Sequence, residues 1–117
     1  MMKKFSLIFE LCNCSNGDLA DNDALEEKFM RMLTGSGFTP VSSQKKEFTP
    51  HGLTLAAILT ESHALLHSWP EESRLSIDIY TCSDPAKLES FIGMALEEFN
   101  PGKYFFKVID RNKIVDL

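Results

Sequence analysis

The chain has 117 residues and a mass of 13.2 kDa, which is the size of one domain. Apolar residues make up 44% and charged residues 25%, as in ordinary globular proteins, and the net charge is −5. An acidic chain is a poor ligand for nucleic acid, because phosphates need a basic surface. No apolar run approaches the roughly 18 residues that span a bilayer. We therefore expect neither nucleic acid nor a membrane as a partner.

The N-terminus begins like a signal peptide, but its apolar stretch is only Phe5–Phe9, and Glu10 ends it. This pattern predicts a first strand over residues 5–11 rather than an export signal. The chain has three cysteines, an odd number. Without an export signal, we expect them to be reduced thiols in a cytoplasmic protein.

A first helix is predicted after Asp21-Asn22-Asp23, which supply an N-cap and early acidic charge. Gly35 and Gly37 end it. Its apolar residues recur with helical spacing and form one face. That face holds Leu25, Phe29, Met32 and Leu33.

Several strands should follow, joined by short turns. Residues 41–48 could form the second strand, and Pro50-His51-Gly52 is a turn. Residues 53–59 are almost wholly apolar, which predicts a buried central strand. Residues 75–82 alternate: Leu75, Ile77 and Ile79 point one way, while Ser76, Asp78, Tyr80 and Cys82 point the other.

A second helix begins at Asp84-Pro85 and ends at Asn100-Pro101-Gly102, and residues 104–109 form the last strand. The buried face of this second helix carries Leu88, Phe91, Ile92, Ala95, Leu96 and Phe99. The expected fold is α+β: a two-layer sandwich of a mainly antiparallel sheet with two helices packed on one face. The other sheet face then needs a cover, which dimerisation can supply.

Chemistry-bearing residues are densest between Thr60 and Glu72. His63 and His67 could share a zinc ion on a helix, but on a strand they lie about 13 Å apart. Pro70 and the neighbouring apolar strand favour extended chain, so we expect no metal. The Gly-x-Ser-x-Gly motif of hydrolases is absent. Cys12 and Cys14 lack a matching second pair of metal ligands and are more simply structural thiols.

Read as a unit, four segments resemble the prokaryotic S-adenosylmethionine decarboxylases, whose pattern includes Glu-Ser-His and His-Thr-Trp-Pro-Glu, and the spacings match without a gap. These segments are Phe48–Thr54, Leu59–His63, His67–Glu71 and Ile77–Cys82. The chain departs from the family pattern at a few positions, none of which removes a group that the chemistry needs. It has Thr54 where serine is common, Ser68 for threonine, Ser83 for glycine, and His51 where an aromatic residue is often found.

The resemblance implies a self-processing proenzyme that cuts itself between Glu61 and Ser62, giving chains 1–61 and 62–117. The Ser62 hydroxyl attacks the Glu61 carbonyl, the amide becomes an ester, and β-elimination followed by loss of ammonia leaves a covalent pyruvoyl group. By position, His67 assists this processing, and Thr54 occupies the place of a second assisting hydroxyl. The pyruvoyl group forms a Schiff base with the substrate amine and takes up the electrons left by the departing CO₂.

Further roles follow from the resemblance alone. Cys82 matches the proton donor to the substrate carbon. A helix N-terminus just beyond Cys82 favours its thiolate and burial favours the thiol, so the sequence leaves that balance open. Phe48 matches a residue that stacks on adenine, Glu71 is placed to hold the ribose or the sulfonium cation, and Trp69 lines the pocket or packs in the core.

The implied product supplies aminopropyl groups for spermidine, and the implied assembly is a homodimer of cleaved protomers. Two alternatives stay open. One is a pyruvoyl-dependent decarboxylase of ornithine or arginine, which would have no adenosine to hold. The other is an unprocessed, non-catalytic member of the family. The sequence does not indicate whether putrescine or a metal ion activates the protein.

Overall fold

Six strands form one antiparallel sheet in the order β2-β3-β4-β5-β1-β6. The computed structural model describes residues 3–14 and 19–115. In chain order the elements are β1 (Phe5–Cys14), α1 (Asn22–Gly35), β2 (Pro40–Glu47), β3 (Leu53–Leu59), β4 (Ser62–Trp69), the 3₁₀ turn η1 (Pro70–Glu72), β5 (Arg74–Thr81), α2 (Ala86–Phe99), β6 (Pro101–Asp110) and α3 (Arg111–Ile114).

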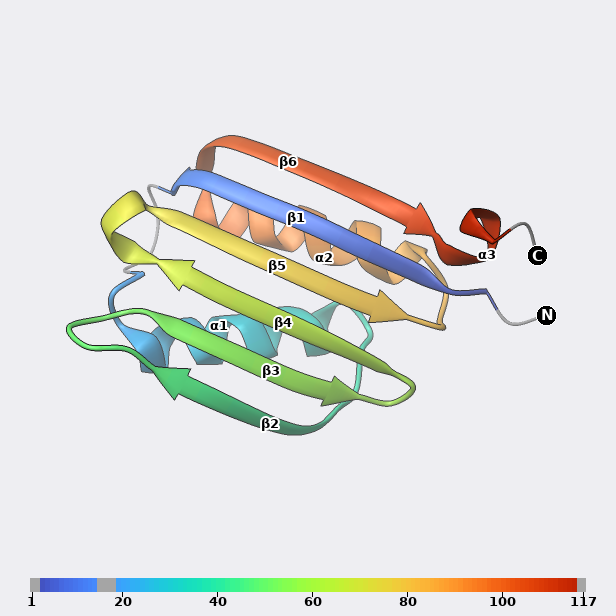
Figure 1. Ribbon diagram of the computed structural model, residues 1–117, viewed down its shortest axis with the longest axis horizontal. Coiled ribbons are helices and arrows are strands. Elements are labelled where there is room, and N and C mark those ends of the chain that lie inside the picture. The colour runs from blue at the N-terminus through green and yellow to red at the C-terminus, as the bar shows by residue number, and fades with distance from the viewer. Residues whose placement is uncertain (1–2, 15–18, 116–117) are drawn as a thin grey trace.

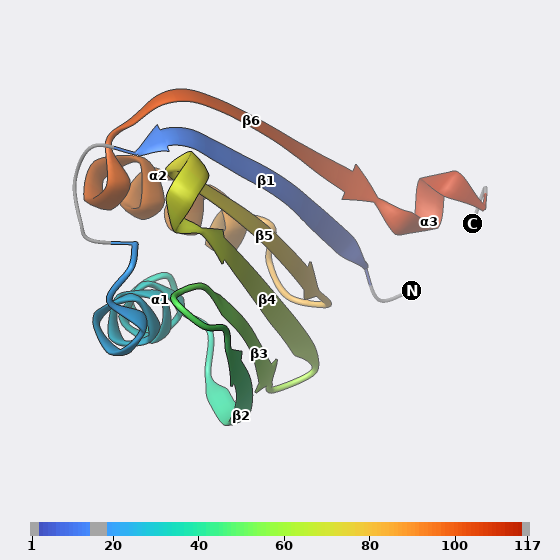
Figure 2. The same cartoon turned by 60° about the vertical axis from the view of Figure 1, so that its left-hand side comes forward.

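Both long helices cover the same face of the sheet, so the molecule has two layers (Figures 1 and 2). Alternate residues of the central strands turn their side chains toward the helices, and these side chains make up most of the core. The rings of Phe29 on α1 and Phe91 on α2 meet edge to face, with centroids 5.9 Å apart. The predicted α+β sandwich, with two helices on one side of an antiparallel sheet, is confirmed.

The helix positions also follow the sequence signals. Asp21 accepts a hydrogen bond from the Ala24 N–H and caps α1, whose predicted apolar face is buried. On α2 the predicted face is buried except for Leu96, which is only partly so. The helix ends where Asn100 adopts a left-handed conformation, with φ of 41°.

Three details differ from the prediction. Residues 53–59 form β3, which is buried on one face only, because no helix covers the other face; Ile58 is 58% exposed there. The strand β1 extends to Cys14 and β6 starts at Pro101, since each is the hydrogen-bonded partner of the other over this length. A short third helix, α3, follows β6 and was not predicted.

We call the sheet surface opposite α1 and α2 the open face. It mixes apolar side chains with polar and charged ones. Its members include Ile8, Glu10, Thr54, Ile58, His63, Leu65, His67, Trp69, Arg74, Ser76, Asp78, Tyr80 and Phe105. A polar network joins β5 and β1 on this face, where one carboxylate oxygen of Glu10 accepts hydrogen bonds from Arg74 and Ser76 at 2.8–3.0 Å. Among the described residues, no helix has the length and apolarity needed to cross a bilayer.

Candidate active site

The β3–β4 connection places Glu61 and Ser62 at the end of a hairpin. Leu59 pairs with Ser62, so only Thr60 and Glu61 make the turn. Glu61 has φ of 59°, a left-handed conformation that costs a residue with a side chain about 1 kcal/mol or more. The Ser62 hydroxyl donates to Thr81 Oγ1 at 3.3 Å. The peptide between Glu61 and Ser62 therefore follows a strained residue, beside a hydroxyl held by the neighbouring strand.

The open face beside this hairpin forms a hollow of about 350 Å³. Its lining includes His63, Asp78, Tyr80 and Arg111. Cys82 follows β5 at this end of the sheet, carries a free half-buried thiol, and donates to Tyr80 Oη over 3.8 Å. The pKa of Tyr80 is raised above its usual value, chiefly by the hydrogen bond with Cys82 and then by burial. The phenol therefore stays protonated at neutral pH.

A second hollow, of about 300 Å³, lies at the opposite end of β4. Its lining unites five of the predicted site residues: Phe48, Thr54, His67, Trp69 and Glu71. The Thr54 hydroxyl and His67 Nδ1 are 3.0 Å apart across the β3–β4 pair. His51, also in the lining, has its Nδ1 3.6 Å from Glu71 Oε2.

The β2–β3 turn holds Phe48 over this second hollow. Gly52 closes the turn by accepting a hydrogen bond from the Phe48 N–H, and its φ of 121° is one that glycine readily adopts. Asn22, at the start of α1, donates to the Gly52 carbonyl, which fastens the turn to the helix layer. The buried Ser68 hydroxyl accepts from the Leu53 N–H, so the serine at this position supports the strand beside the hollow.

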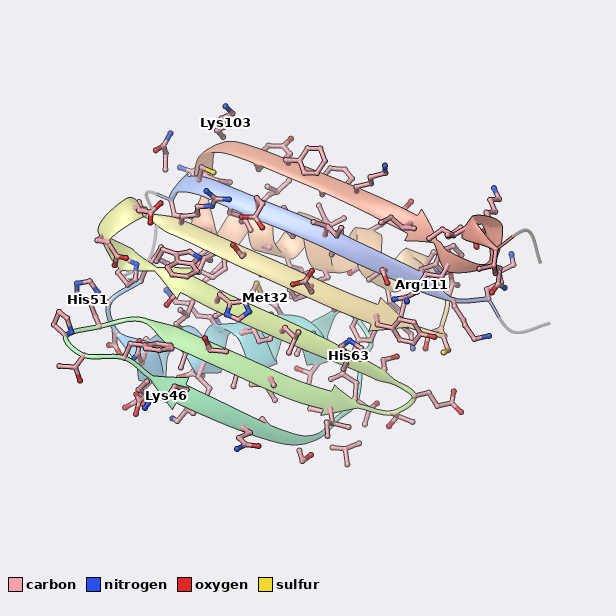
Figure 3. The ribbon with its side chains drawn as sticks, viewed as in Figure 1. Met32, Lys46, His51, His63, Lys103 and Arg111 are labelled. Carbon is pink, nitrogen blue, oxygen red and sulfur yellow. The ribbon has the colours of Figure 1, made fainter. Side chains whose placement is uncertain are left out.

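The predicted site residues thus fall into two groups, and the structure does not bring the groups together. Ser62 and His67 are five residues apart on one strand, which is about 16 Å. Ser62 turns its hydroxyl toward buried Thr81 on the helix side, whereas His67 lies on the open face. Figure 3 shows the same separation, with His51 at one end of the sheet and His63 and Arg111 at the other.

Sequence reasoning missed Thr81, Tyr80 and Arg111 as neighbours of the site. Tyr80 lay on the strand face predicted for Cys82, which was the available signal. Arg111 carried no signal, because its position depends on α3 and on the pairing of β6 with β1, which connect residues far apart in the chain.

Comparisons with known proteins agree with this architecture. Residues 6–112 match the family model for S-adenosylmethionine decarboxylase. An S-adenosylmethionine decarboxylase proenzyme from Archaeoglobus fulgidus is 33% identical over 105 residues, covering 90% of this chain and 94% of the relative. The proenzyme of the same name from Methanococcus aeolicus is 35% identical over 111 residues, 94% of either chain.

A solved structure, the adenosylmethionine decarboxylase from Aquifex aeolicus, superposes with a TM-score of 0.84 at 24% identity. The superposition covers 93% of this chain and 90% of that one, which establishes a shared fold. The protein is therefore an α+β protein with the fold of that decarboxylase. By sequence, the chain belongs to the S-adenosylmethionine decarboxylase family, and the predicted resemblance is confirmed.

Proposed function

We propose that this chain cuts its own backbone between Glu61 and Ser62 and then decarboxylates S-adenosylmethionine. The observation that carries the proposal is the hairpin: Glu61 is left-handed, and Ser62 follows it with a hydroxyl fixed by Thr81. Strain in the residue before the scissile peptide is relieved when the bond is broken. The hydroxyl adds to the Glu61 carbonyl carbon, the bond to the Ser62 nitrogen breaks, and an ester forms.

The sheet order supports a cleaved protein that stays in one piece. Residues 1–61 contribute β1, β2 and β3, and residues 62–117 contribute β4, β5 and β6. Because β1 lies between β5 and β6, the first fragment is inserted into the second. The strand pair β3–β4 holds them together a second time. Cutting the hairpin therefore removes one covalent link and leaves the hydrogen-bonded ladders intact.

The assembly we propose is a homodimer in which two open faces stack. His67 cannot reach Ser62 of its own chain, because about 16 Å of strand separates them. A two-fold axis lying between the faces and crossing the strands reverses the strand direction, which sets one copy's Thr54–His67 end against the other's Ser62–Cys82 end. Exposed Ile8, Ile58 and Phe105 on this face favour such a cover.

The second hollow suits an adenosine with a positive sulfonium group. Phe48 and Trp69 are exposed aromatic side chains on its rim, and aromatic faces attract both flat rings and cations. The Glu71 carboxylate can accept hydrogen bonds from ribose hydroxyls or attract the cation. In the stacked dimer this hollow lies over the end of the partner's sheet that carries Ser62 and Cys82.

The residues at the Ser62 end fit a pyruvoyl group, since a hydroxyl precursor and a half-buried thiol lie at the same end of the sheet. When present, this group supplies an electron sink for the bond that releases CO₂. Cys82 then returns a proton to the substrate carbon. The decarboxylated product serves as an aminopropyl donor for spermidine, and the reduced state of the free thiols fits a cytoplasmic location.

The test is release of labelled CO₂ by the purified protein from carboxyl-labelled S-adenosylmethionine, ornithine and arginine in parallel. We expect release from S-adenosylmethionine alone. In Glu71→Gln and Phe48→Leu, KM for that substrate should rise, with Ile58→Val as a control elsewhere on the open face. Release from ornithine or arginine instead would overturn the substrate assignment, and release from none of them would overturn the proposed activity.

A further inference from the structure

The ring of Tyr80 is held on both sides at the Ser62 end of the open face. His63, on the neighbouring strand β4, stacks on it with centroids 5.5 Å apart and planes 7° from parallel. The Arg111 guanidinium of α3 lies 5.0 Å from the ring centroid. Figure 3 shows His63 and Arg111 at the same end of the sheet. The ring therefore has little freedom to turn.

Arg111 is itself fixed by the strand on the other side of β5. Its guanidinium donates to Ser6 Oγ at 3.0 Å, and its backbone N–H donates to the Lys4 carbonyl at 2.8 Å. A cation over an aromatic face is attracted by the ring as well. His63, Tyr80 and Arg111 thus form a stack of flat groups in that order, and this stack connects β4, β5 and α3.

Tyr80, in the middle of this stack, contacts the thiol of Cys82, the residue that the sequence resemblance implies as the proton donor. Tyr80 Oη lies 3.8 Å from Cys82 Sγ, within hydrogen-bonding range for sulfur. Cys82 comes just after β5 ends, so the strand ladder does not fix its side chain. The phenol is therefore a fixed point against which the thiol can be held.

We propose that Tyr80, clamped between His63 and Arg111, is a positioning residue that holds the Cys82 thiol in its protonated form at the Ser62 end of the site. This inference rests on the proposed role of Cys82 in the decarboxylation. A hydrogen bond that the thiol donates stabilises the thiol over the thiolate. A thiol that has kept its proton can deliver it to the substrate carbon, whereas a thiolate cannot.

Three charged or titratable groups line the hollow at this end: Arg111 on α3, His63 on β4 and Asp78 on β5. Asp84 lies two residues beyond Cys82, and its carboxylate accepts a hydrogen bond from the Ala86 N–H. The pKa of Tyr80 is raised by its hydrogen bond with Cys82 and by burial, so the phenol is neutral at neutral pH.

The experiment compares Tyr80→Phe with Tyr104→Phe in the full-length protein. The chain has two tyrosines, and Tyr104 lies on β6, where its ring is exposed. Tyr80→Phe keeps the stacked ring and removes only the hydroxyl. Each protein is treated with iodoacetamide across a range of pH, and alkylation is followed at each cysteine by peptide mass spectrometry, with Cys12 and Cys14 as internal references.

We expect alkylation of Cys82 at neutral pH to be about two- to fivefold faster in Tyr80→Phe, the factor expected for one weak hydrogen bond, with the pH profile displaced toward lower pH. Cleavage at Ser62 and KM stay as in the wild type, while kcat falls by a similar factor. Tyr104→Phe changes none of these. If Tyr80→Phe does not fold, Arg111→Lys, which keeps the positive charge but removes the flat guanidinium that holds the ring, should displace the Cys82 profile in the same direction.

An unchanged Cys82 profile in the folded variant overturns the inference. The thiol readout needs no turnover, so it separates this inference from the proposed function. If the wild-type protein neither cleaves nor releases CO₂, the proposed function fails and the proton-donor role fails with it. The contact between Tyr80 and Cys82 is then still decided by the alkylation profiles.

Discussion

Mixing two inactive chains tests whether the processing site is shared between protomers. Ser62→Ala lacks the attacking hydroxyl but keeps His67, and His67→Ala lacks the imidazole but keeps Ser62. Within one chain the two residues lie about 16 Å apart on β4, which argues against a site made by one chain alone. If the site did lie within one chain, each variant would lack one of its groups, and neither would be cut, whether expressed separately or together. In a mixed dimer with stacked faces, the partner's His67 lies against the Ser62 end of the His67→Ala chain, which is cut once the Ser62 hydroxyl turns from the helix side toward the open face.

The yield follows from symmetry. Equal co-expression gives about half mixed dimers, and each contains one repaired site and one that lacks both groups. About half of the His67→Ala chains, or about one quarter of all chains, should therefore be cleaved. Denaturing mass spectrometry with a differently tagged copy of each variant measures this fraction, and each variant expressed alone is the control. A mixture with no cleaved chain would refute the shared site.

Other predictions concern stability and thiol chemistry. Ser68→Ala leaves the buried Leu53 N–H without its acceptor and should lower the free energy of unfolding by about 1–3 kcal/mol in urea titrations, unlike Ser43→Ala on exposed β2. Phe29→Ala removes the ring that packs on α2 and should cost about 3–5 kcal/mol; a loss below 1 kcal/mol would contradict that packing. Burial, followed by the charge of a neighbouring thiolate, raises the pKa of Cys14 from 9.0 to about 11. Stability that is fully present below pH 9 should therefore fall as the pH rises toward 11, and Cys14→Ala should flatten this dependence in pH-dependent melting curves.

The sequence predicted those features that depend on local pattern. The helical spacing of Leu25 and Phe29 and the two-residue alternation of β5 each record which side chains are buried, so both elements and their faces could be predicted. The predicted burial of β3 on both faces was wrong, because an apolar run looks the same in the sequence whether one face of the strand is covered or both. Only the position of the helices determines which faces are buried.

The family motif names candidate site residues one by one, but their arrangement in space could not be predicted from it. The family motif carries Ser62, His67 and Cys82 within a short stretch, which suggests a compact cluster. A strand spreads such a stretch along its length and over both of its faces, so two of these residues meet only if another chain contributes one. Contacts such as that between Arg111 and Tyr80 depend on distant pairing and left no trace in the local sequence.

The central claim, cleavage ahead of Ser62, is tested most directly by the intact mass of freshly purified protein after denaturation, with Ser62→Ala beside it. The account predicts two fragments from the wild type, residues 1–61 and a second that begins at position 62 with a blocked, serine-derived cap. The fragments should elute together on a sizing column before denaturation, because β1 is held between β5 and β6. Ser62→Ala should give one intact chain. A wild-type protein that remains a single species of 13.2 kDa while it decarboxylates S-adenosylmethionine would contradict the account.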